Sequence, residues 1–146
     1  MKARHPCLAT FAHITTLPLQ WGDHDAFGHV NNTVYIRWAE TARVEYMIAA
    51  GMWPQLPPSQ IGPILASIKC DYKLALTHPD TVHIGTKVSR IGNSSLRMDH
   101  VIVSHNADAV AAEIESTIVM LDYSVQRPVR VPDEMRRSIA AVEAKV

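Results

Sequence analysis

The sequence predicts an α+β domain in which an antiparallel sheet packs against one long helix. Apolar residues recur at helical spacing over residues 32–50, whereas four segments between residues 63 and 123 alternate apolar and polar side chains with a period of two. No helical segment intervenes between these strands, so a parallel sheet built from βαβ units is not expected. The apolar stripe of the helix must therefore be buried against the apolar face of the sheet.

The first elements are a strand over residues 13–21 and a helix over residues 32–50. Pro18 cannot donate a backbone hydrogen bond, so this strand is expected at a sheet edge or at a bulge. The helix spans about 28 Å at roughly 1.5 Å per residue, enough to cross a sheet, and Gly51 can end it in the left-handed conformation. Its expected buried stripe consists of Val34, Tyr35, Trp38, Ala42, Tyr46 and Ala49.

The rest of the chain is expected to form a proline-rich loop over residues 52–62, four strands and a short helix. The strands cover residues 63–74, 81–91, 95–104 and 109–123, with hairpin turns at Gly92-Asn93 and at residues 105–108. Asp133, which follows Pro132, can cap a final helix over residues 133–144. In residues 63–74 the alternation runs without a slip through Ile64, Ala66, Ile68, Cys70, Tyr72 and Leu74.

Composition predicts a single globular domain over residues 1–146. Its hydrophobic content of 47% suits a packed core, and its net charge of zero gives no indication of a nucleic-acid or membrane-surface partner. No apolar run is long enough for a membrane span, and residues 1–12, an irregular leader, lack the hydrophobic stretch of a signal peptide. Two cysteines, Cys7 and Cys70, are too few for a disulfide framework and fit a cytoplasmic setting.

The most informative stretch is WGDHDAFGHVNN, residues 21–32. Asp23 and Asp25 lie in a turn-like loop that leads into the predicted helix, where free backbone N–H groups and the positive end of the helix dipole point outward. A carboxylate beside such an electrophilic end is suited to attacking or polarising a carbonyl group. The alternative is a loop whose Asp and Asn residues only cap turns.

The run D-H-D-A-F-G-H-V-N-N, followed by Tyr35, Glu40 and Arg43, resembles the hot-dog-fold acyl-CoA thioesterases related to 4-hydroxybenzoyl-CoA thioesterase. The resemblance covers all but about the first dozen residues. It implies a curled five-stranded antiparallel sheet wrapped around one central helix, a homodimer or homotetramer, and hydrolysis of acyl-CoA to the free acid and coenzyme A. An acyl-carrier-protein thioesterase and a non-catalytic acyl-thioester binding module are the alternatives.

The resemblance also implies roles for two residues of the loop, and three others are candidates from their type and position. Asp25 matches the carboxylate that attacks the thioester or activates water, and the backbone N–H of Asn32 matches the group that holds the thioester oxygen. Gly28 lies where the chain turns tightly and a ligand can approach closely. His29 would orient Asp25, contact substrate or fix the loop, and Asp23 is favoured as a structural acceptor over a direct catalytic part.

The turn between the second and third of the four later strands resembles the place where family members meet the nucleotide of coenzyme A. The candidates there are Arg90, Asn93, Ser94 and Ser95, with Arg97 as a further phosphate ligand, although this sequence also suits a plain hairpin.

No cofactor is expected. No metal is expected either, because His24 and His29 lack a further ligand at suitable spacing. The acyl group stays open, since Trp38, Tyr46, Met52 and Trp53 suit either an acyl pocket or a core.

Overall fold

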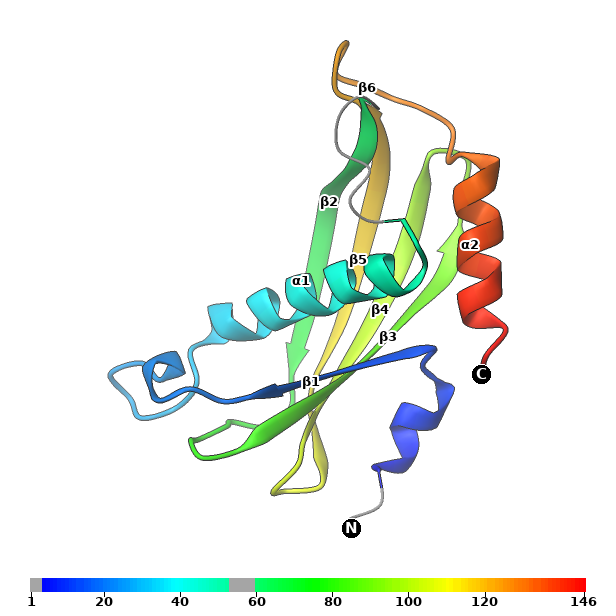
Figure 1. Ribbon diagram of the computed structural model, residues 1–146. Coiled ribbons are helices and arrows are strands. Elements are labelled where there is room, and N and C mark those ends of the chain that lie inside the picture. Colours follow the sequence, from blue (N-terminus) through cyan, green and yellow to red (C-terminus); the bar gives the residue numbers. More distant parts are fainter. Residues whose placement is uncertain (1–3, 53–59) are drawn as a thin grey trace.

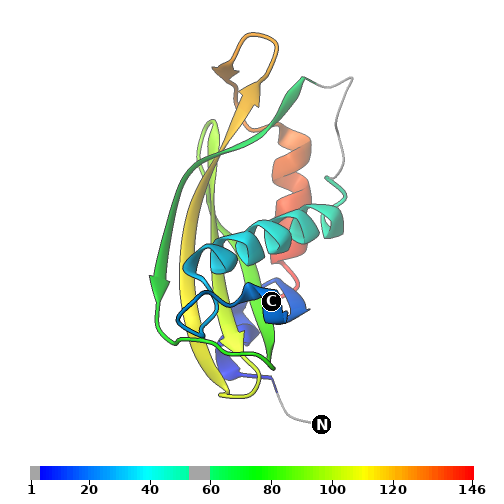
Figure 2. The same cartoon turned by 90° about the vertical axis from the view of Figure 1, so that its left-hand side faces the viewer.

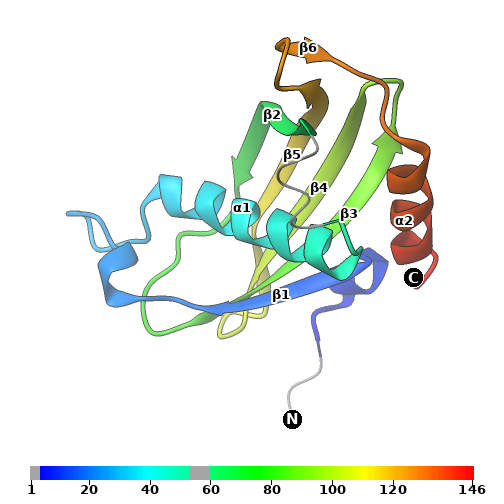
Figure 3. The same ribbon diagram turned by 45° about the horizontal axis from the view of Figure 1, so that its top comes forward.

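The computed structural model describes residues 4–52 and 60–146, and it shows a curled antiparallel sheet wrapped around one long helix (Figure 1). Helix α1 (Asn32–Ala49) lies on the concave face of the sheet, as views from the side and from above also show (Figures 2 and 3). The predicted fold class is thereby confirmed. The strands are β1 (His13–Pro18), β2 (Ile61–Tyr72), β3 (Thr81–Ile91), β4 (Ser95–Ser104), β5 (Ala109–Asp122) and β6 (Arg127–Pro128).

The strand order is β1-β3-β4-β5-β2, so β1 and β2 form the two edges of the sheet. All neighbouring strands are antiparallel, and the two-residue β6, which pairs with β5, is an addition to the five expected strands. The bounds of β3 and β4 match the prediction from sequence, and β5 ends one residue early. Within the described ranges, no helix is long and apolar enough to cross a membrane.

Strand β1 is an edge strand, as Pro18 predicts, but it is shorter than expected. It ends at Pro18, and the chain then forms the short 3-10 helix η2 (Trp21–Asp23). The expectation of a strand to Trp21 is therefore wrong, because the Asp23 N–H bonds the Gln20 carbonyl at 3.0 Å and the Gln20 N–H bonds the Asp23 carboxylate at 2.8 Å, which turns the chain out of the strand. The Trp21 side chain is 73% exposed.

Helix α1 begins and ends as the sequence indicates. Asn31 is its N-cap, and the Asn31 side chain accepts a hydrogen bond from the Thr33 backbone N–H at 2.9 Å. Gly51 follows the helix with a φ of +73°, the left-handed conformation that glycine adopts without strain. The expected stripe is buried except for Ala49 in the last turn, which is exposed while Met47 is buried.

Strand β2 departs from the prediction because it is an edge strand with a bulge. Its register with β5 shifts between Leu65 and Ser67, so the alternation expected without a slip over residues 63–74 is broken there. Nothing in the described chain covers the outer side of this edge, and Ile64, Leu65 and Tyr72 are 40–45% exposed. The strand also starts earlier, at Ile61, while residues 53–59 of the expected loop, Trp53 included, lie outside the described residues.

The final helix, α2 (Asp133–Glu143), is anchored at both ends. Its N-cap is Pro132, so the capping role expected of Asp133 is wrong, because the Asp133 carboxylate instead accepts a hydrogen bond from Arg130 at 2.6 Å. Arg136 donates to the backbone carbonyls of Gly92 and Asn93 at 2.7 and 3.1 Å. At the other end, the Tyr46 hydroxyl donates to the Glu143 carboxylate at 2.6 Å. These contacts fix α2 beside the C-terminal end of α1 (Figure 1).

The segment before β1 packs on the sheet face opposite α1. It contains the 3-10 helix η1 (Pro6–Thr10), whose Leu8 is buried with Val101 and Val103. Phe11, which follows η1, lies so close to Gly85 of β3 that an added Cβ would meet the Phe11 ring carbon Cγ at 2.6 Å and Cβ at 3.0 Å. Glycine at position 85 therefore allows this segment to cover the sheet.

We expect Gly85→Ala to lower the free energy of unfolding by about 1–3 kcal/mol, the usual cost of overpacking. The clash involves atoms near the Phe11 backbone, which a rotamer change cannot move far. Thermal unfolding measures the loss, and Gly22→Ala is the control because a Cβ there meets nothing within 4 Å. Equal melting temperatures for the two variants would contradict the close packing of Phe11 on the sheet.

Candidate active site

The loop that joins η2 to α1 is a tight, hydrogen-bonded turn. The Gly28 N–H donates to the Asp25 carbonyl at 3.1 Å, the Asp25 N–H donates to the His29 carbonyl at 2.9 Å, and His24 and Val30 form an isolated bridge. Gly28 has a φ of +78°, where any other residue would be strained. The turn therefore requires, at position 28, the positive φ that glycine adopts without strain.

Asp25 lies at the first corner of this turn with a partly exposed carboxylate. Its Oδ1 accepts a hydrogen bond from the Phe27 backbone N–H at 2.9 Å, which fixes the orientation of the group. Phe27 itself is 87% exposed. The side chain of Asp25 is therefore held by the backbone of its own loop while it remains open to a small molecule.

Asp23, by contrast, is buried and fully engaged in holding the loop. Its carboxylate, 4% exposed, accepts from the Gln20 N–H at 2.8 Å and from the Arg37 guanidinium at 2.7 Å. Its backbone carbonyl accepts from the Asn31 N–H at 2.9 Å. Asp23 thus ties the loop to helix α1 at two points, which places Asp25 relative to the helix N-terminus.

The N-terminus of α1 presents the backbone N–H of Asn32, for which no acceptor is found among the residues that the structure describes. Asn32 is the first helical residue and is exposed, so its N–H has no acceptor within the helix. Its carbonyl accepts a hydrogen bond from the Tyr72 hydroxyl of β2 at 2.9 Å. This contact joins the end of β2 to the start of α1, beside the loop that carries Asp25.

The two histidines of the loop have different surroundings. His29 is exposed, and its backbone carbonyl, rather than its ring, is what contacts Asp25 in the hydrogen bonds above. His24 accepts a hydrogen bond from the His78 N–H at 2.8 Å and packs edge-on to Trp21 at 5.0 Å between ring centroids. Among the described residues, no three His, Cys, Asp or Glu side chains are grouped to hold a metal ion.

Of the helix residues of the motif, Tyr35 is buried and Arg43 is partly buried, whereas Glu40 is exposed. The Tyr35 hydroxyl donates to the Leu74 carbonyl at 3.0 Å, and burial raises the Tyr35 pKa to about 12. Burial lowers the pKa of Arg43, an effect that the nearby charge of Glu40 opposes. None of these three side chains carries an obvious reactive role.

The candidate coenzyme A residues are only partly brought together. Arg90 and Ser95 line a hollow of about 330 Å³ with Arg97, whose guanidinium is paired to Asp99 and Glu115 at 2.9 and 2.7 Å. Asn93 and Ser94 are not among its described lining. Their backbone carbonyls instead accept from the Val131 and Met120 N–H groups, respectively, and so support the fold.

Sequence reasoning missed three contacts of this region: Arg37 with Asp23, Tyr72 with Asn32, and His78 with His24. Arg37 lies one turn into the helix, on the side of the buried Asp23 carboxylate, which needs a cation. The position of Arg37 in the sequence was therefore a weak signal of this ion pair. The other two join residues 40 and 54 positions apart in the chain, so no local pattern reveals them.

Comparison with known proteins agrees with this architecture. Residues 19–139 match the model of the thioesterase-like superfamily, and the chain belongs to this family. The resemblance noted in the loop motif is confirmed.

Three related proteins illustrate the likeness. The chain is similar to a thioesterase from Thermus thermophilus complexed with coenzyme A and Zn, with 29% identity, a TM-score of 0.81, and coverage of 92% of this chain and 96% of that one. It is 22% identical to the long-chain acyl-CoA thioesterase FadM of Escherichia coli (strain K12), over 79% of this chain and 87% of FadM. It is 26% identical to YsmA of Bacillus subtilis (strain 168), over 62% of this chain and only 60% of YsmA.

Proposed function

We propose that this protein hydrolyses acyl-CoA thioesters to the free acid and coenzyme A. The observation that carries the proposal is the pairing of a fixed, accessible carboxylate at Asp25 with the exposed N-terminus of α1 at Asn32. Coenzyme A in the related thioesterase from Thermus thermophilus and the acyl-CoA activity named for FadM support this substrate class. The alternatives are an acyl-carrier-protein thioesterase and a non-catalytic binding module.

The proposed reaction uses groups that are already in place. The Asn32 N–H and the positive end of α1 stabilise the oxygen of the thioester carbonyl as it gains negative charge. Asp25 takes a proton from a water molecule whose oxygen attacks the carbonyl carbon, or it attacks that carbon itself. The carbon–sulfur bond then breaks, and the thiol product leaves with a proton. If Asp25 acts as the nucleophile, water hydrolyses the resulting anhydride in a second step.

The other loop residues position these two groups. Asp23, held by Arg37, sets the distance between the loop and α1, and we assign it this role rather than a direct part in the chemistry. Gly28 allows the turn that presents Asp25, while His29 contributes its carbonyl to the same turn. Arg90, Ser95 and Arg97 are the candidates for contact with the nucleotide, supported by the hollow that they line. Asn93 and Ser94 are assigned a structural part, through the hydrogen bonds that their backbone carbonyls accept.

Thiol release from a panel of acyl-CoA esters tests this function. Hydrolysis of at least one ester, with coenzyme A released in equal amount to the acid, supports it. Hydrolysis of the acyl-carrier-protein ester alone would favour the first alternative, whereas tight acyl-CoA binding without turnover would favour the second.

We further propose that the protein is a homodimer that pairs the β2 edges of two subunits, with a tetramer as a further step. β2 is a long edge strand with no further strand paired to its outer side in the described part of the chain, and large apolar side chains are exposed along it and in the turn after β5. Those on β2 are Ile61, Ile64, Leu65 and Tyr72, and those in the turn after β5 are Tyr123 and Val125. A second copy of the same edge would cover these side chains and complete the ladder.

Light scattering is expected to give a dimer or tetramer mass at micromolar concentration. Ile64→Lys should shift the mass toward the monomer, because it places a charge in the proposed contact. Val146→Lys, the same change at an exposed apolar residue that follows α2, is the control and should leave the mass unchanged. A wild-type monomer with full activity would contradict the proposal.

A further inference from the structure

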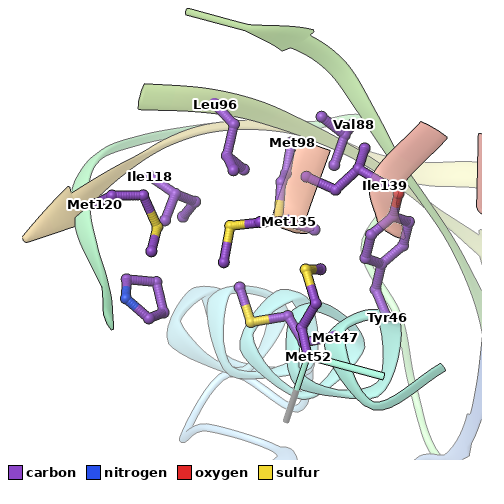
Figure 4. Close-up of a pocket in the computed structure, with 11 residues that line it drawn as sticks. Tyr46, Met47, Met52, Val88, Leu96, Met98, Ile118, Met120, Met135 and Ile139 are labelled. Atoms are coloured by element: carbon purple, nitrogen blue, oxygen red, sulfur yellow. The ribbon is translucent and has the colours of Figure 1, made fainter. Parts of the chain in front are cut away.

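Helix α1 is fixed by side-chain packing at its C-terminal end. Tyr46 and Met47 are buried there, where α1, α2 and the inner face of the sheet meet (Figure 4). The packing leaves only a cavity of about 10 Å³, roughly the room of one water molecule. We call it the methionine cavity, because its lining includes Met47, Met52, Met98, Met120 and Met135.

The N-terminal turn of α1 lacks such packing. The side chains of Asn32 and Thr33 are exposed, and burial begins only at Val34. The first turn of a helix frays unless other groups bond its terminal peptide groups. The direction of the Asn32 N–H, the proposed oxyanion donor, therefore depends on the hydrogen bonds made around it.

Three hydrogen bonds hold the backbone groups on either side of the Asn32 N–H. The Asn31 carbonyl accepts from the Val34 N–H at 3.0 Å, and the Thr33 N–H donates to the Asn31 side chain at 2.9 Å. The third is the bond at 2.9 Å from the Tyr72 hydroxyl to the Asn32 carbonyl. Two of these bonds lie within the first turn and its cap, whereas the bond from Tyr72 ties this turn to strand β2.

Tyr72 is itself held in place. Its backbone pairs with Ala112 of β5, and its ring packs edge-on against the ring of Tyr35, with 5.1 Å between the centroids. Tyr35 is buried and fixed by its own bond to the Leu74 carbonyl. Burial, together with the nearby Cys70 thiol, raises the pKa of Tyr72. The hydroxyl therefore stays protonated at neutral pH and keeps the proton that it donates.

We propose that Tyr72 is a positioning residue for thioester hydrolysis, whose hydroxyl holds the first turn of α1 so that the Asn32 N–H points at the thioester oxygen. This inference rests on the proposed function. Because the hydroxyl proton is engaged by the Asn32 carbonyl, Tyr72 acts through the helix and not by contact with the substrate. A donor that is fixed in advance stabilises the charge that develops in the transition state, so the bond affects kcat more than KM.

The first test asks whether Tyr72 holds the turn, and it needs no substrate. Tyr72→Phe removes only the hydroxyl, and hydrogen exchange at the Thr33 N–H, in the same peptide group as the Asn32 carbonyl, should become at least about threefold faster. Tyr123→Phe is the control and should leave this exchange unchanged. Tyr123 is 44% exposed against 45% for Tyr72, and its hydroxyl donates to the Pro63 carbonyl at 2.6 Å. Equal exchange in the wild type and Tyr72→Phe would overturn the inference.

The second test asks whether the bond acts through the Asn32 N–H. Tyr72→Phe should lower kcat about three- to tenfold with KM unchanged, while Tyr123→Phe should change neither. Asn32→Pro removes the group that Tyr72 positions, so Tyr72→Phe added to Asn32→Pro should lower kcat no further. A further loss of the same size in that background would show that Tyr72 contacts the substrate. That result, or a wild-type kcat in Tyr72→Phe alone, would overturn the inference.

Two controls separate this inference from the other proposals. Both tyrosine variants keep the aromatic ring, so light scattering should give the wild-type mass for each. A lower mass for Tyr72→Phe would assign its kinetic loss to the subunit contact and overturn the inference. Failure of the wild type on every acyl-CoA would contradict the proposed function and, with it, the catalytic part of this inference, whereas exchange at Thr33 would still decide whether Tyr72 holds the turn.

Discussion

Asp25→Asn is expected to lower turnover of acyl-CoA at least about a hundredfold while it leaves the fold and substrate binding intact. A general base or nucleophile contributes on this scale, and an amide can do neither. The amide oxygen can still accept the hydrogen bond that the Phe27 N–H now gives to Oδ1, so the turn keeps its shape. Steady-state kinetics should show the loss in kcat, with KM little changed.

Two further carboxylates serve as comparisons for this variant. Asp108→Asn changes an exposed carboxylate in the turn before β5 and should have no effect on turnover. Asp23→Asn weakens the contact with Arg37, so we expect a lower melting temperature together with a smaller loss of activity. Near wild-type turnover in Asp25→Asn, with a dead Asp23→Asn, would move the chemistry to Asp23.

Much of the fold could be predicted because its central elements carry local patterns. In strands β3, β4 and β5 the side chains that face α1 are mostly apolar and buried, whereas those on the other face are more exposed or lie under the segment before β1. This difference produces the alternation of apolar and polar residues, with clear turns between the strands. The bounds of α1 were equally readable, since the helical spacing of apolar residues starts after residue 32 and Gly51 follows the last turn. In these elements local preference and tertiary packing agree.

The errors fall where specific contacts override the simple alternation. The bulge in β2 depends on pairing with β5, and the early end of β1 depends on the hydrogen bonds between Gln20 and Asp23. Asp133 failed as a cap because Arg130 holds its carboxylate. In the site, the turn at Asp25 was readable from its glycine and asparagines. The bond from Tyr72 to Asn32 and the methionine cavity both depend on how distant segments meet.

The backbone donor at Asn32 can be tested with a proline. Asn32→Pro deletes the N–H, and we expect turnover to fall roughly 10²–10³-fold, the typical loss for one oxyanion donor. The fold should survive, because proline is favoured at the first helical position and Asn31 already has the extended geometry that a following proline requires, with φ −61° and ψ 142°. The Asn32 carbonyl, which accepts from Tyr72, is retained.

Two matched variants separate the lost donor from other effects of the substitution. Asn32→Ala keeps the N–H and should retain much of the activity, while Asp133→Pro places a proline at the first position of α2, away from the site, and should leave turnover unchanged. A folded Asn32→Pro enzyme with normal turnover would remove the oxyanion role from this N–H. If Asn32→Ala were as inactive as the proline variant, the role would pass to the Asn32 side chain, because the two variants would then share only its loss.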